Sequence, residues 1–313
     1  MIVVEYKFGA VVGSDADDLL AIGYRYDAVG GFPWSCASYV VQTEPDAMHA
    51  LVGGVGMLTG IWRSPTGRVH VADAHNAEMM ASTGPSPRAA AWQQHALGFA
   101  PAGVWGLDDD FVLAWGGEGD REKMACFDGR AWQPMPGPGD MVMKVHGPSR
   151  DLVHAVGKDG MIARWDGRAW RRVACPVVST LASVFVVSED ELWACSHDGV
   201  LLRGSARGWA QVLDHGEALF DVVHWRGAAW VAAPFEGLLR FDGEALVNVK
   251  DNARPSFLHA TPGALLAACD DRVMATRDGT SWRGRLRRQL AECFRGRPAE
   301  WAPSAPFEDT GGV

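Results

Sequence analysis

Two features that organise many proteins are missing from this sequence: long apolar runs and closely spaced cysteines. No apolar run reaches the roughly 18 residues that a membrane-spanning helix needs. The chain begins Met1-Ile2-Val3-Val4-Glu5-Tyr6-Lys7, without the basic segment and apolar stretch of a secretory signal. Six cysteines lie far apart with no Cys-x-x-Cys pair, which argues against a zinc ribbon or a small disulfide scaffold. We therefore expect a cytoplasmic protein with free, mostly buried thiols.

Net positive charge is also missing. The 313 residues carry a formal net charge of -9, which argues against a main role in holding nucleic acid or an anionic membrane. No His-Glu-x-x-His, Gly-x-Ser-x-Gly or Walker pattern is present, so we predict no cofactor, no metal and no catalytic residue. Apolar residues make up 48% and charged residues 21%, which is enough to bury a real core.

What the sequence does contain is a repeat of just under 40 residues. The motif Asp-Gly-Arg-Ala-Trp occurs at Asp128–Trp132 and again at Asp166–Trp170, with variants at Asp242–Leu246 and Asp278–Trp282. Its anchor positions are 40, 38, 39, 37 and 36 residues apart, and they are Trp92, Trp132, Trp170, Trp209, Leu246 and Trp282. Such a period is typical of solenoids and propellers.

Each repeat reads as four short strands. In the unit Leu219–Val249, three turns separate four β-rich runs, and Asp242-Gly243 predicts a two-residue hairpin with positive φ at both positions. Four antiparallel strands per unit make the blade of a β-propeller. We predict an all-β, single-domain propeller over residues 1–286, with a short helix and loose tail over 287–313. Seven blades fit best and six is the alternative, with approximate blades at 1–52, 53–99, 100–139, 140–177, 178–214, 215–251 and 252–286.

The Asp-Gly-x-x-Trp blades resemble bacterial propellers grouped with WD40, YVTN and BNR (Asp-box) repeats. The copy Thr276–Trp282 is the most similar to the Asp-box of sialidase-like blades, although it lacks the residue between Asp278 and Gly279. That box is a structural turn, so the resemblance implies a fold and no activity. A sialidase-like enzyme would also need a late tyrosine nucleophile, whereas the four tyrosines here all lie within the first 39 residues.

The loops between second and third strands, which share one face of a propeller with the loops between blades, all contain acid. The pairs are Asp73 with His75, Glu118 with Asp120, Lys158-Asp159, His197-Asp198, Phe235-Glu236 and Asp270-Asp271. We predict that this face binds a basic protein, as an immunity-type neutraliser of a cationic effector would. The predicted contact residues are Asp120, Asp159, His197, Asp198, Phe235, Glu236, Asp270 and Asp271. The alternative is that Asp and Gly are simply good turn formers.

Two other functions stay open: a glycan hydrolase or lyase with a central-channel pocket, and a carbohydrate-binding lectin. His146, His224 and His259 recur near the end of the first strand of three blades, which we interpret as packing and not as a metal ring. The repeated tryptophans should pack between blades, and Trp34 is a second candidate loop anchor. The arginine-rich stretch after residue 282 should dock onto the propeller's own acidic surface.

Overall fold

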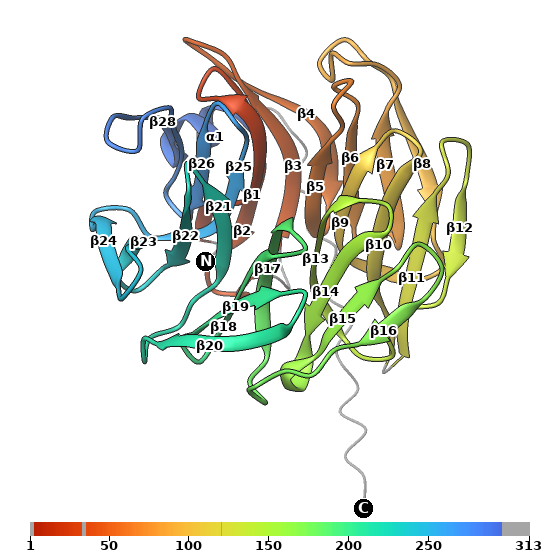
Figure 1. The fold of residues 1–313 in the computed structure, drawn as a ribbon. Helices are drawn as coiled ribbons and strands as arrows, with labels where there is room; N and C mark the ends of the chain where they lie inside the picture. The colour runs from red at the N-terminus through yellow and green to blue at the C-terminus, as the bar shows by residue number, and fades with distance from the viewer. Residues whose placement is uncertain (1–2, 33–35, 120, 296–313) are drawn as a thin grey trace, which may run out of the picture.

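Seven four-stranded antiparallel sheets stand around a common centre in a computed structural model of the chain (Figure 1). The structure describes residues 3–32, 36–119 and 121–295. Every sheet is built from four consecutive strands, with the first strand of each lining the centre. The chain is therefore the seven-bladed β-propeller that its repeat predicts.

The strands have the following bounds. Blades 1 to 3 contain β1 (Val4–Asp15), β2 (Asp18–Asp27), β3 (Cys36–Thr43), β4 (Met48–Val55), β5 (Leu58–Arg63), β6 (Val69–Asp73), β7 (Glu78–Ser82), β8 (Trp92–Ala96), β9 (Ala100–Asp108), β10 (Phe111–Glu118), β11 (Arg121–Phe127) and β12 (Trp132–Met135). Blades 4 and 5 contain β13 (Val142–Ser149), β14 (Leu152–Gly157), β15 (Ile162–Trp165), β16 (Trp170–Arg172), β17 (Leu181–Ser188), β18 (Glu191–Ser196), β19 (Val200–Ser205) and β20 (Gly208–Asp214). Blades 6 and 7 contain β21 (Asp221–Trp225), β22 (Ala228–Ala233), β23 (Gly237–Phe241), β24 (Leu246–Lys250), β25 (Pro255–Ala260), β26 (Leu265–Cys269), β27 (Arg272–Thr276) and β28 (Trp282–Leu286).

Two short helical elements complete the fold. A 3₁₀ turn, η1 (Lys158–Gly160), lies between β14 and β15, and α1 (Arg287–Cys293) follows β28. With seven residues, α1 is far too short to cross a bilayer, and the described residues contain no other candidate span. The first blade continues to Val55, beyond the boundary expected at residue 52, because β4 uses the glycine-rich segment as strand.

The repeated aspartates cap the turns between third and fourth strands. Asp128 Oδ1 accepts the backbone N–H groups of Arg130 and Ala131, both at 2.9 Å, and the aspartates of three later copies do the same. Only the following glycine has positive φ, +90° at Gly129, so the expected two-residue hairpin is wrong. The loop has four residues, and the aspartate satisfies donors that such a loop leaves open.

The repeated tryptophans join neighbouring blades, as predicted. Trp132 of blade 3 lies edge-on to His70 of blade 2, with ring centroids 6.4 Å apart. Trp209 of blade 5 contacts His154 of blade 4 in the same way, at 6.1 Å. Trp170 and Trp282 pack against apolar clusters that include the preceding blade. Each tryptophan thus fills the wedge between outer strands, where inner strands alone would leave a gap.

The first and last blades, 1 and 7, meet at a seam (red and blue in Figure 1). Phe8 of β1 donates its backbone N–H to the carbonyl of Asp270, 3.2 Å away. Leu290 and Phe294, at the end of α1, are buried against blade 1, where the Phe294 ring lies 4.9 Å from the Tyr39 ring. Nearby, Arg285 lies 3.3 Å from Asp17. The arginine-rich stretch therefore docks onto acidic blade 1, as expected.

A loop face and a central channel

The two faces of the ring are defined by its connections. On one face lie the loops between second and third strands together with the connections between blades; we call it the loop face. The other face, the turn face, carries the two remaining turns of each blade. Of the predicted contact residues, Asp159, His197, Asp198, Phe235, Glu236, Asp270 and Asp271 all belong to loop-face loops. Asp120 lies outside the described residues, and so does Trp34.

Several of the predicted acids already have partners. Arg272 Nη2 lies 2.6 Å from the Asp271 carboxylate, and its hydrogen bonds hold the pKa of Asp271 below the usual range. Glu236 lies 2.8 Å from His215 Nε2. Asp73 is buried and caps its own turn through the N–H groups of His75 and Asn76. In the described loops, the carboxylates of Asp73, Glu236 and Asp271 are therefore already engaged within the chain.

Exposed acids instead gather on blades 5 to 7. They are Asp198, Asp214, Glu217, Asp251 and Asp270, which we call the acidic sector. Of the loop-face bases in this sector, Arg254 is exposed, whereas Arg272 is paired with Asp271. Beside it, exposed Asp159 has a positive φ of 54° and is followed by Gly160. The loop face is thus acidic over one part of its circumference.

The loop face also carries exposed apolar side chains. Val29, Met141, Val178 and Phe235 are 73%, 53%, 86% and 66% exposed, and each lies in a loop-face connection. None of the described turn-face loops exposes a large apolar side chain. Phe235 also borders a hollow lined by Asp251, Arg254 and Asp270. An apolar anchor next to exposed charge is typical of a protein-binding surface.

Sequence reasoning found Phe235 but missed the three aliphatic residues. A valine or methionine in a loop is chemically unremarkable in a sequence, because its exposure depends on how neighbouring blades pack. Phe235 stood out only because it lies beside an acid at a predicted loop tip. Its ring lies 6.5 Å from that of Phe220, which in turn contacts the His197 ring at 5.0 Å. His197 therefore supports an aromatic cluster on this face.

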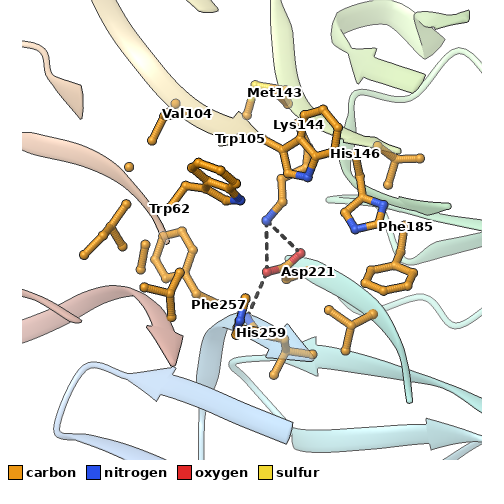
Figure 2. Close-up of a pocket in the computed structure, with 18 of the residues that line it drawn as sticks. Trp62, Val104, Trp105, Met143, Lys144, His146, Phe185, Asp221, Phe257 and His259 are labelled. Atoms are coloured by element: carbon orange, nitrogen blue, oxygen red, sulfur yellow. Dashed lines mark hydrogen bonds and ion pairs between the residues drawn. The ribbon is translucent and has the colours of Figure 1, made fainter. Parts of the chain in front are cut away.

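The second feature is a cavity of about 340 Å³ in the central channel (Figure 2). Its walls are the inner strands of the blades, and its polar centre is Lys144 of β13 with Asp221 of β21. The Lys144 Nζ atom lies 3.3 Å and 3.4 Å from the two carboxylate oxygens of Asp221. Trp62, Trp105, Phe185 and Phe257 surround this pair (Figure 2). No motif predicted it, since the two residues are 77 positions apart.

Asp221 connects four blades. Its carboxylate accepts the hydroxyl of Ser183 in blade 5 at 2.5 Å and the backbone N–H of Leu258 in blade 7 at 2.9 Å. It also accepts its own neighbour's N–H, from Val222, at 3.1 Å, and it faces Lys144 of blade 4. The residue is only 2% exposed, so these contacts replace water completely.

The three histidines noted in the sequence do not form a metal site. His146 and His259 line the channel, whereas His224 lies 3.6 Å from Glu191. Burial lowers the pKa of His146 to about 3 and that of His259 to about 4, so both are neutral at pH 7. Within the described ranges, no group of three or more His, Cys, Asp or Glu residues could hold a metal ion.

Replacing Asp221 should weaken the ring strongly. We expect Asp221→Ala to lower the free energy of unfolding by about 3–5 kcal/mol, because it leaves Lys144 and three buried donors without their partner. Urea unfolding followed by circular dichroism measures this. Asp198→Ala, at an exposed loop, is the control and should change stability by less than about 0.5 kcal/mol. Equal stability of the two variants would contradict the role given to Asp221.

Comparison with known proteins gives one related sequence and many related folds. No protein-family model matches the chain. Immune protein Tsi7 of Pseudomonas aeruginosa is 26% identical over 125 residues, a match that spans 36% of this chain and 41% of that relative. The chain thus covers less than half of the relative's length.

Solved propellers cover much more of the chain at lower identity. A catalytically inactive virginiamycin B lyase from Staphylococcus aureus, solved with quinupristin, has a TM-score of 0.64 and 10% identity over 86% of this chain and 97% of its own. The WD40 propeller domain of Doa1 has a TM-score of 0.64 and 9% identity, covering 86% and 93%. At such identities the likeness concerns the backbone alone. The chain therefore has the β-propeller fold, in seven blades.

Proposed function

We propose that this protein is a binding propeller of the immunity type, which neutralises an effector protein by covering it with the loop face. The observation that carries the proposal is the placement of the four exposed apolar loop residues on one face of the ring. Burial of such side chains drives protein association. The partial likeness to immune protein Tsi7 supports the same function.

The acidic sector supports a proposal about the charge of the partner. Five exposed carboxylates lie on the loop face of blades 5 to 7. Two of them, Asp251 and Asp270, line the hollow that Phe235 borders, together with the exposed base Arg254. A partner with a basic surface around an apolar pocket would match this arrangement and would be steered to it by charge. We therefore propose a basic effector as the partner, bound in the cytoplasm.

Co-expression tests the function. Proteins encoded by the genes next to this one would each be produced in a bacterial host, with and without the chain. We expect one of them to stop growth alone, and growth to resume when the chain is present and co-purifies with it. If no neighbouring product is toxic, or if the chain rescues growth without binding the product, the proposal is wrong.

Substitution of Phe235 tests the loop face. We expect Phe235→Asp to weaken binding of that effector at least about 30-fold, because an aromatic anchor at the centre of an interface carries a large share of the binding energy. Bio-layer interferometry measures it. The matched control is Val247→Asp on the outer strand β24, which is exposed but lies off the loop face. If both variants bind like the parent, the effector uses another surface.

Charge reversal tests the basic partner. We expect Asp198→Lys with Asp270→Lys to slow association about tenfold or more at low salt, with a smaller effect at high salt. Asp190→Lys, exposed on the turn face, should leave the association rate unchanged. If neither salt nor the double substitution changes the association rate, the partner is not basic. The loop face could still be the binding surface in that case.

A further inference from the structure

The central channel gathers N–H groups with few acceptors to receive them. Figure 2 shows the Trp62 indole nitrogen and the Lys144 ammonium pointing into the same space, with the His146 ring facing it from the side. Among the described residues, neither the Trp62 indole nitrogen nor His146 Nε2 has a hydrogen-bond partner. These groups come from β5 and β13, so the fold itself holds them around the cavity.

Lys144 is only partly neutralised by Asp221. Charge-assisted N–H···O bonds are about 2.7–2.9 Å long, whereas the two Lys144 contacts are 3.3 Å and 3.4 Å. Asp221 already accepts three closer donors, from Ser183, Val222 and Leu258. The Lys144 side chain keeps 33% of its surface exposed. An ammonium group with free N–H bonds therefore remains available inside the channel.

The tautomer of His146 is fixed by the backbone. Its Nδ1 atom accepts the N–H of Val186 at 3.0 Å, so Nδ1 carries no hydrogen. Burial keeps the ring neutral at pH 7, and the single ring hydrogen must then lie on Nε2. The ring stacks on Phe185 with centroids 4.1 Å apart, which fixes its direction. His146 is thus a donor on the side that faces the cavity.

The walls around these donors are apolar. Trp62, Trp105, Phe257 and Met143 border the cavity, and its volume of about 340 Å³ falls in the range of small-molecule sites. We propose that the channel binds a small organic carboxylate with a flat apolar body. Its carboxylate accepts hydrogen bonds from Lys144, the Trp62 indole and His146, and its body lies between the aromatic side chains.

The residues of this site are not among those of the proposed partner surface. A second hollow of about 590 Å³ shares Trp62, Gly106 and His259 with the cavity and extends among turn-face loops such as Pro65–Gly67. A small molecule can therefore reach the channel from the face that the effector leaves uncovered. The inference does not depend on the proposed function, and either can fail without the other.

Isothermal titration calorimetry of the full chain with 2-naphthoate tests the site. We expect one molecule to bind per chain, and 2-naphthalenemethanol, which has the same rings without the charge, to bind at least tenfold more weakly. Lys144→Met should weaken 2-naphthoate at least tenfold. Asp221 keeps three other donors in that variant, so the ring should still form. Lys158→Met, an exposed lysine of η1, is the control.

Trp62→Phe is the second variant, and it keeps the test decisive if Lys144→Met does not fold. This substitution keeps an aromatic side chain at position 62 and removes the indole N–H. We therefore expect 2-naphthoate to bind severalfold more weakly, with little change in the binding of 2-naphthalenemethanol. Trp193→Phe is its control, since that indole lies 3.4 Å from Glu191, away from the cavity lining. Absence of 2-naphthoate binding, equal binding of the alcohol, or full affinity in the channel variants would each overturn the proposal.

Discussion

Lowering the pH from 7 to 5 should remove most of the stability of this propeller, and unfolding should be half complete between about pH 4 and 5. Four interior histidines are the cause: His70 and His154 are buried, and His146 and His259 line the central channel. Burial lowers the pKa to about 3 for His70 and His146 and to about 4 for His154 and His259, from an ordinary value of 6.5. All four are therefore neutral in the folded protein down to about pH 4.

The sign of the effect follows from which state binds more protons. Below pH 6.5 the unfolded chain takes up a proton on each histidine and the folded protein does not, so protonation favours unfolding as the pH falls. At pH 5 each histidine removes about 2 kcal/mol, and together they remove about 8 kcal/mol. That is comparable to the whole stability of a typical domain, about 5–15 kcal/mol. Burial raises the pKa of Glu78 and of Glu122, which opposes the trend at these two carboxyl groups.

Circular dichroism as a function of pH measures the transition. His70 is the best residue to replace, because both its ring nitrogens are buried without a partner while its ring contacts Trp62 and Phe127. His70→Phe should keep the aromatic packing and move the midpoint to lower pH. The control His75→Gln, at an exposed loop, should leave the midpoint in place. A parent protein that stays folded at pH 3.5 would contradict the prediction.

Loss of the apolar contacts of the C-terminal segment should open the ring at its seam. Leu290 and Phe294 are 0% and 1% exposed and pack against blade 1, where Leu290 lies over Gly23 so closely that an added Cβ would be 2.4 Å from its Cδ1 atom. Truncation of a buried leucine costs about 2–5 kcal/mol and of a buried phenylalanine about 3–5 kcal/mol. The double variant Leu290→Ala with Phe294→Ala should therefore lose about 5 kcal/mol or more.

Thermal unfolding measures this loss, and limited proteolysis locates it. We expect cleavage to appear first in β1 or in residues 287–295, ahead of the other blades. Arg288→Ala, on the exposed side of the same helix, is the control and should melt like the parent. A double variant that melts at the parent temperature would show that β1 closes the ring without help from α1.

The architecture was predictable because it repeats. One aspartate-glycine corner is weak evidence, but copies at Asp128, Asp166, Asp242 and Asp278 with a shared period define a blade. The number of blades was predicted as seven, with six as the alternative. The conformation of that corner was not predictable from the same pair, since the Asp128 side chain replaces the second positive-φ residue by accepting two backbone N–H groups. The Asp-Gly pattern therefore predicted the four-stranded blade correctly and the conformation of the turn between its third and fourth strands incorrectly.

Only one property of the candidate site could be predicted from the sequence: which loops lie together on one face of the propeller. Which loops share a face follows from strand order, so Asp198, Phe235 and Asp270 could be placed together. Whether an acid is paired depends on side chains from other loops, and His215 beside Glu236 has no sequence signal. The channel pair of Lys144 and Asp221 could have been suspected from one hint, a charged residue within an otherwise apolar inner strand, Val142–Val145.

The seam has an evolutionary consequence. The described strands of every blade follow one another in the chain, and blades 1 and 7 meet through side chains, one backbone hydrogen bond and one short helix. Each sheet is thus a self-contained cassette. Duplication or deletion of one such sheet would change the number of blades without changing the strand order in any other blade. The condition is that residues such as Leu290 and Phe294 still pack against a neighbouring blade.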